Sequence, residues 1–168
     1  MIKFRKMTEE EFEAFSVETR ERYKNDKIRA NGFTEEKARK IAEEGFAKIL
    51  PNGLDSKDNF LFTLVDEKSN GIGHLWYCIR GTSNNRNAFI ADIFICEGCR
   101  GKGFGRQAMT LLESEVKPQG FNRIGLHVFG FNQPAIKLYK SLGYEVTDLV
   151  MEKTLTKQTK QERKNRRR

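Results

Sequence analysis

The sequence predicts an α+β (α/β) fold with a mixed, mainly antiparallel central sheet of about six to seven strands and about four flanking helices. Three observations support this prediction. Two capped helical segments follow a short first strand. Three strand-like segments, separated by turn-forming residues, come next, and helices then alternate with strands to the end of the pattern. No internal repeat interrupts this order, and 168 residues fit a single domain.

The amino-terminal third is predicted to contain one strand and two helices. Residues 1–6 alternate apolar and charged side chains, as a strand with one buried face does. The capping-box pattern T-E-E-E starts a helix at Thr8, and Gly32 ends it. Thr34 caps a second helix, which stops at the turn formers of residues 50–53.

The middle of the chain contains three strand candidates, at residues 60–66, 73–80 and 88–95. Turn formers at residues 68–71 and 81–87 separate them. An antiparallel meander is the simplest connection between strands that are joined in this way.

The last third is predicted to alternate helices and strands. A glycine-rich turn after the third strand candidate opens a helix that runs to about Val116. Residues 123–129 read as a strand, and Asn132 caps a helix through Leu142. Residues 144–155 are predicted to form a last strand.

Most of the positive charge belongs to the carboxyl-terminal end. The chain carries a net charge of +8, of which +6 lies in residues 156–168. We therefore expect a folded domain at residues 1–155 and a basic, disordered tail at residues 156–168, with nucleic acid as a partner only through this tail. No apolar run approaches the length of a membrane span, and residues 1–7 lack a signal-peptide pattern, so a cytoplasmic protein is expected.

The cysteine pattern argues against a disulfide framework and against a metal site. Three cysteines are present, and Cys96 and Cys99 form a lone C-x-x-C. A zinc site needs further ligands, and neither a second C-x-x-C nor an H-x-x-x-H occurs. We expect reduced thiols and no metal, although a loss of activity on oxidation stays open.

A glycine-rich turn, R-G-K-G-F-G at residues 100–105, is the first functional signal. A strand, a glycine-rich turn and a helix start in this order form an anion cradle, because backbone N–H groups and the positive helix end converge on phosphate. Arg100, Lys102 and Arg106 add positive charge. The spacing fits neither a Walker A loop nor the G-x-G-x-x-G dinucleotide fingerprint, and the kinase tripeptides are absent.

A second motif indicates which ligand the glycine-rich turn is expected to bind. Residues 132–144 read N-x-x-A-x-x-L-Y-x-x-L-G-Y, and residues 100–105 read R-x-x-G-x-G. This pair of motifs, in this order, resembles the signature segments of the GNAT superfamily of acyl-CoA-dependent N-acetyltransferases. The resemblance covers about the first 155 residues and the same order of elements. It implies a GNAT-like fold and direct transfer of an acetyl group from acetyl-CoA to a primary amine in a ternary complex.

The resemblance also implies where acetyl-CoA binds. The cradle holds the pyrophosphate, and the strand before it pairs with the pantetheine arm across a gap between two splayed strands. A backbone N–H near Ile95 stabilises the oxyanion. The residues expected to bind acetyl-CoA are Phe94, Ile95, Cys96, Arg100, Gly101, Lys102, Gly103, Phe104, Gly105, Arg106, Asn132, Ala135 and Tyr139. Tyr139 is also expected to protonate the departing thiolate.

The identity of the group that removes a proton from the amine stays open: it is one of two carboxylates or a chain of waters. Asp92 is a charge inside an apolar strand, which calls for a partner, a cavity or a function. A salt bridge is the alternative explanation for it. Glu97, at the end of the same strand, is the second candidate. The frequent Pro-Glu-Tyr of the superfamily is replaced here by Glu97-Gly98-Cys99, and His74 and His127 are expected to be structural.

Two further questions stay open at this stage. The acceptor is a small-molecule or peptide amine, and its site is expected within residues 8–55. A different class of function is a non-catalytic acyl-CoA-binding regulatory domain, tethered to nucleic acid or membrane by the basic tail. The protein is expected to be a monomer or a homodimer, and the exposed apolar residues of the last strand are the expected seam of a dimer.

Overall fold

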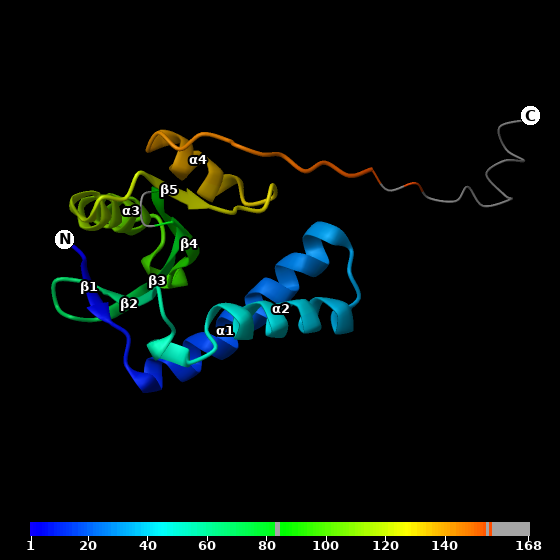
Figure 1. The fold of residues 1–168 in the computed structure, drawn as a ribbon, viewed down its shortest axis with the longest axis horizontal. Coiled ribbons are helices and arrows are strands. Elements are labelled where there is room, and N and C mark those ends of the chain that lie inside the picture. The colour runs from blue at the N-terminus through cyan, green and yellow to red at the C-terminus, as the bar shows by residue number, and fades with distance from the viewer. Residues whose placement is uncertain (83–84, 154, 156–168) are drawn as a thin grey trace, which may run out of the picture.

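The computed structural model describes residues 1–82, 85–153 and 155. Within these residues, a five-stranded sheet in the order β1-β2-β3-β4-β5 is flanked by four α-helices (Figure 1). The strands are β1 (Lys3–Lys6), β2 (Asn59–Val65), β3 (Gly71–Thr82), β4 (Asn85–Ile95) and β5 (Arg123–Leu126). The helices are α1 (Glu9–Asn31), α2 (Glu35–Ile49), α3 (Phe104–Val116) and α4 (Gln133–Ser141).

The sheet is antiparallel except at one edge. β1 pairs with β2, β2 with β3 and β3 with β4, all antiparallel. The last two pairings confirm the meander that was predicted for the three middle strands. β5 pairs with β4 in the parallel sense. A parallel pair needs a crossover connection, and α3 provides it. The predicted mixed, mainly antiparallel sheet is therefore confirmed.

Local capping chemistry sets the ends of α1 and α2. Oγ1 of Thr8 accepts a hydrogen bond from the N–H of Glu11, whose carboxylate accepts from the N–H of Thr8, which completes the predicted capping box. Gly32 ends α1 in the left-handed conformation, at a φ of 64°. Oγ1 of Thr34 accepts from the N–H of Lys37 at the start of α2.

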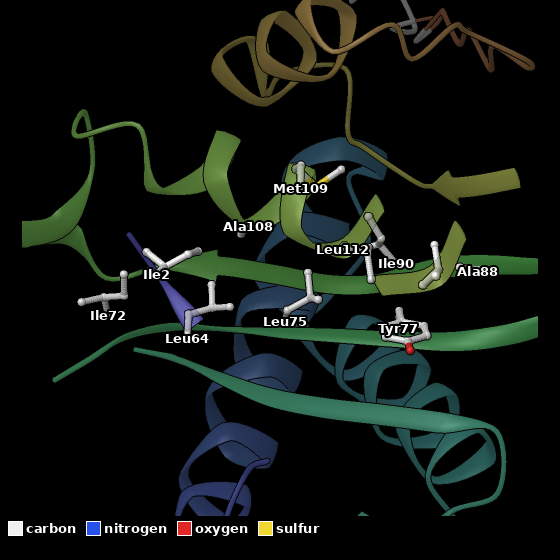
Figure 2. Packing of buried hydrophobic residues seen from close by; sticks show 11 residues of the cluster. Ile2, Leu64, Ile72, Leu75, Tyr77, Ala88, Ile90, Ala108, Met109 and Leu112 are labelled. Carbon is white, nitrogen blue, oxygen red and sulfur yellow. The ribbon is translucent and has the colours of Figure 1, made fainter. Parts of the chain in front are cut away.

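Helices cover both faces of the sheet. On one face, Ala108, Met109 and Leu112 of α3 pack against Leu75 and other inward-facing strand residues (Figure 2). On the other face, α1 and α2 enclose a second cluster of Met7, Phe15, Leu50, Leu61 and Trp76. Trp76 and Tyr77, adjacent in β3, fall in different clusters because successive strand residues point to opposite faces. α1 therefore packs on the face of the sheet to which Trp76 points.

The prediction of a last strand is wrong, and with it the count of six to seven strands. Residues 144–153 form no strand, and the only recorded backbone hydrogen bond from this segment to an earlier element joins the N–H of Tyr144 to the carbonyl of Tyr139. The sequence pattern indicated only residues that suit a strand. It could not supply a partner strand, and a strand needs one for its N–H and C=O groups.

Candidate active site

The parallel pair β4–β5 separates halfway along β4. Its register runs from Asn87 opposite Arg123 to Ile90 opposite Leu126 and stops there. The pairing of β3 with β4 shifts at the same level, where Trp76 faces Asp92 and Tyr77 faces Ile90, so Ala91 is an extra residue in β4. Such a bulge bends a strand and increases its twist. Beyond it, residues 92–95 remain paired with β3 only, which opens the predicted gap.

A large cavity occupies this gap. Its volume is about 1050 Å³, at the upper end of the ordinary range for ligand pockets. Its walls come from α1, α2, the second half of β4, the glycine-rich turn, the residues after β5, and α4. The cavity is therefore large enough for a long ligand and a second, smaller one side by side.

The glycine-rich turn forms one end of the cavity. Gly101 and Gly103 have φ angles of 74° and 78°, in the left-handed region that side chains with a Cβ rarely adopt. Gly103 is the N-cap of α3 and offers no side-chain oxygen to the helix. Within the described residues, no acceptor is recorded for the backbone N–H groups of residues 101–105. These N–H groups and the helix end are the parts from which the anion cradle is expected to form.

Two arginines beside the cradle are held by neighbouring elements. Nε of Arg100 donates to the carbonyl of Ile95 at 3.0 Å, and the guanidinium of Arg106 donates to Oγ of Ser141 at 2.6 Å. Both side chains line the cavity. The Nζ of Lys102 instead donates to the carbonyl of Gly98, at 2.9 Å, outside the cavity lining.

The structure brings together most of the residues expected to bind acetyl-CoA. Those that line the cavity are Phe94, Ile95, Arg100, Gly101, Gly103, Phe104, Gly105, Arg106, Asn132, Ala135 and Tyr139. Cys96 and Lys102 do not line it. Asn132 has a second role, because its Oδ1 accepts from the N–H of Ala135 and caps α4.

Asp92 lies in the cavity wall and is also tied into a polar network. Its Oδ2 accepts from Oγ1 of Thr19 at 3.1 Å and from the guanidinium of Arg22, both on α1, and lies 2.8 Å from Nε2 of His74 on β3. Burial acts to raise the pKa of Asp92, but the hydrogen bond and charge of His74, with Arg22 and Thr19, outweigh it and hold the pKa below its usual range. The guanidinium of Arg22 also stacks 4.5 Å from the ring centroid of Phe94.

Tyr139 reaches the cavity from α4. No hydrogen bond from its hydroxyl is recorded within the described residues. Burial, and after it the negative charge of Asp92, raise the pKa of Tyr139 to about 12. The phenol is therefore protonated at neutral pH and can donate a hydrogen bond into the cavity.

Glu97 and the cysteines lie elsewhere. Glu97 is exposed in a short 3₁₀ turn (Glu97–Cys99) and does not line the cavity. All three cysteines are free thiols, with Cys78 buried. Among the described residues, no group of three or more His, Cys, Asp or Glu side chains is placed to hold a metal ion. No helix in the described part of the chain has both the length and the apolar character that a bilayer crossing needs.

Sequence reasoning missed a polar stripe on α1. Thr19, Arg22 and Asp26 all line the cavity, at helical spacing that continues the apolar face begun by Phe15. Asp26 is half-buried, and no hydrogen bond or ion pair of its carboxylate is recorded in the part of the chain that the structure describes. Burial raises its pKa. A change from apolar to polar residues along one helix face was the available signal.

The two histidines differ in position. His74 is buried and hydrogen-bonded, as expected of a structural residue. His127 follows β5, lines the cavity and packs edge-on against Phe129, with ring centroids 4.9 Å apart. Burial and then the charge of Lys27 lower the pKa of His127, which favours the neutral imidazole.

Comparison with known proteins finds relatives along most of the chain. Residues 7–144 match the family model described as Acetyltransferase (GNAT) family. The chain is 34% identical to the N-acetyltransferase YycN of Bacillus subtilis over 149 residues, which are 89% of this chain and 96% of YycN. It is 32% identical to YdgE of the same organism, also an N-acetyltransferase, over 89% of this chain and 95% of YdgE.

A solved structure shows the same fold. The crystal structure of YycN from Bacillus subtilis superposes on this chain with a TM-score of 0.88 and 32% sequence identity. The superposition covers 94% of this chain and 100% of the YycN chain.

Proposed function

The chain belongs to the GNAT family of N-acetyltransferases, and from this premise we propose that it transfers the acetyl group of acetyl-CoA directly to a primary amine in a ternary complex. One observation carries this proposal. A single cavity of about 1050 Å³ connects the anion cradle, the free edge of β4, Tyr139 and the polar stripe of α1. Donor and acceptor can therefore occupy it together, with no need for a covalent acetyl-enzyme.

The acetyl-CoA side of the cavity extends from the cradle to Asp92. The pyrophosphate accepts hydrogen bonds from the N–H groups of residues 101–105, with Arg100 and Arg106 adding charge. The amides of the pantetheine pair with the edge of β4 at residues 91–95, which has no strand partner on the β5 side. The thioester then lies near Tyr139.

The acceptor side is formed by α1 and α2. Thr19, Arg20, Tyr23 and Asp26 of α1 and Phe46 of α2 line it. Asp26 is the carboxylate there without a recorded cation partner in the described residues. An ammonium group entering the cavity can pair with it. Aromatic rings and arginines complete this wall, which suits an amine that carries both apolar and polar parts.

Three groups take part in the acetyl transfer: the amine, a backbone N–H near Ile95 and the hydroxyl of Tyr139. The neutral amine attacks the thioester carbon, a C–N bond forms, and a backbone N–H near Ile95 stabilises the oxyanion. The C–S bond then breaks, and Tyr139 gives its proton to the thiolate.

The proton of the amine goes to a carboxylate. Asp26, whose pKa is raised, suits this role better than Asp92, whose pKa is lowered and whose Oδ2 already has three partners. Asp92 then acts by holding Arg22 and His74 in place. Glu97 is a poor candidate because it is exposed outside the cavity.

An assay of free thiol with a panel of primary amines tests the proposal. We expect release of CoA that depends on the amine, and initial-rate lines that intersect when both substrates are varied. A control without amine measures background hydrolysis. Parallel lines together with an isolable acetylated enzyme would contradict the ternary complex, and no release with any small-molecule or peptide amine would contradict the activity.

The alternative function is a regulatory domain that is tethered to nucleic acid or membrane by its basic tail. This tail comprises residues 156–168, which lie outside the described residues.

A further inference from the structure

The cavity lining carries more positive than negative side chains. Within the described residues it contains five arginines, two aspartates and neither lysine nor glutamate. Arg22 is paired with Asp92, and two further arginines lie beside the glycine-rich turn. No ion pair is recorded in the described part of the chain for the other two, Arg20 and Arg80. An acceptor that occupies this cavity therefore meets an excess of positive charge.

Arg80 lies on the face of β3 that turns toward α1 and α2. Trp76 and Arg80 are four residues apart in β3, so their side chains point to the same face. Trp76 packs in the cluster that α1 and α2 enclose. Arg80 is exposed and lines the cavity, and its guanidinium carbon lies 3.3 Å from the ring centroid of Phe89 on β4. Stacking on a ring uses the flat face of a guanidinium and leaves the N–H groups at its edge for a ligand.

The register of the sheet places this guanidinium at a measured step from the site of acetyl transfer. Asp92, whose charge is felt by both Asp26 and Tyr139, marks the level of the reacting amine. The residues of β3 opposite Asp92 and Phe89 are two positions apart. Two residues of a strand span about 7 Å. A chain of about five carbons bridges this distance.

Apolar side chains line the path between these two levels. Ala88 and Ile90 belong to the core beneath α3 (Figure 2), so Phe89 between them points to the opposite face and into the cavity. Phe46 and Ile49 of α2 line the same part of the cavity. This wall suits the methylene chain of a ligand whose two ends are charged.

We propose that the acceptor is a primary amine that also carries a carboxylate, which Arg80 binds. This inference rests on the proposed acetyl transfer and names the class of its acceptor. The amine enters beside Asp26, the methylene chain lies along Phe46 and Phe89, and the carboxylate accepts two hydrogen bonds from the guanidinium. Arg20 adds a second positive charge to this wall. Amino acids with about five carbons between amine and carboxylate are the simplest members of the class.

The ratio of kcat/KM for 6-aminohexanoate to kcat/KM for 6-aminohexanamide tests this proposal, because the two amines differ at their far end in charge. We expect a ratio of about ten in the wild type and a ratio close to one in Arg80→Gln. Arg80→Lys keeps the charge and should retain part of the preference. Arg86→Gln is the matched control, since Arg86 stacks 4.5 Å from the ring centroid of Phe121 and does not line the cavity. Circular dichroism should show all variants folded.

Calorimetry with 6-acetamidohexanoate and saturating CoA measures the same contact without turnover. We expect Arg80→Gln to weaken binding of this product about tenfold and Arg86→Gln to leave it unchanged. Binding that depends on Arg80 in a protein that acetylates no amine would contradict the proposed acetyl transfer and support the carboxylate site. An acid-to-amide ratio that is the same in the wild type and Arg80→Gln would overturn the carboxylate site. Binding that is absent, or that does not depend on Arg80, would overturn it as well.

Discussion

Nε2 of His74 lies 2.8 Å from Oδ2 of Asp92, and the same carboxylate oxygen accepts hydrogen bonds from Thr19 and Arg22. One buried carboxylate therefore connects β4 to β3 and to α1. Residues of all three elements line the cavity. The network fixes the distance between α1 and the edge of β4 on which acetyl-CoA is proposed to lie.

Replacing Asp92 by asparagine should destabilise the fold. The change leaves the guanidinium of Arg22 without its anion, and breaking a buried ion pair typically costs about 3 kcal/mol or more. We expect about 3 kcal/mol, at the low end, because the Arg22 side chain is 30% exposed. Urea unfolding at pH 5 measures the loss. The exposed Glu13→Gln on α1 is the control and should change the free energy of unfolding by less than about 0.5 kcal/mol.

The same variant should lose its effect in acid. The pKa of Asp92 is lower in the folded protein than its unfolded value of about 3.9. The contribution of its carboxylate is then fully present above about pH 4 and is lost as the pH falls through the lower, folded value. The difference between wild type and Asp92→Asn should shrink at pH 3. A difference that grows in acid would show that the pKa of Asp92 is raised.

Gly103→Ala should weaken acetyl-CoA binding by about tenfold or more. A Cβ at a φ of 78° strains the turn by about 1–2 kcal/mol and disturbs the N–H groups that face the anion. Gly120→Ala is a matched control, because Gly120 has a φ of 77° but lies outside the cavity lining. Calorimetry should give normal affinity for this control despite a similar loss of stability. Equal affinities of the two variants for acetyl-CoA would show that the glycine-rich turn does not bind it.

Local sequence chemistry predicted the helix ends and the glycine-rich turn before α3. The capping residues Thr8, Thr34 and Asn132 and the glycines of the turn act through neighbours a few residues away, so their roles can be seen in the sequence. The polar stripe of α1 could not be predicted in this way. Thr19 and Asp92 are 73 positions apart, and their contact depends on how α1 packs across the sheet.

The last strand shows the other limit of sequence reasoning. The sequence predicted a strand at residues 144–155, and the described residues 144–153 form none. Which strand pairs with which depends on the free edges that the folded sheet leaves. The edge of β5 that has no partner among the described residues becomes visible only in the structure.

Asp26→Asn should impair use of the amine and leave acetyl-CoA binding intact. The amide can neither pair with an ammonium group nor take its proton, so we expect kcat/KM for the amine to fall about 100-fold. The acid limb of the pH–rate profile should also change. Glu18→Gln is the control, since Glu18 is exposed on the same helix and does not line the cavity. An unchanged kcat/KM with an unchanged pH profile would exclude Asp26 from both roles.

The pair of tyrosines at the end of α4 allows the sharpest test of the mechanism. Tyr139 lines the cavity, whereas Tyr144 does not, and their rings lie 5.9 Å apart. The hydroxyl of Tyr144 is buried without a hydrogen-bond partner among the described residues, so its removal costs no recorded interaction. Tyr139→Phe and Tyr144→Phe thus remove the same atom from neighbouring sites.

The turnover of these two variants, measured with acetyl-CoA affinity, tests the central claim that Tyr139 protonates the leaving thiolate. We expect Tyr139→Phe to lower kcat by about 100-fold or more while its affinity for acetyl-CoA stays within about twofold, because the proton is needed only in the transition state. Tyr144→Phe should keep the wild-type kcat. A Tyr139→Phe enzyme that turns over at the wild-type rate with every amine would contradict the account.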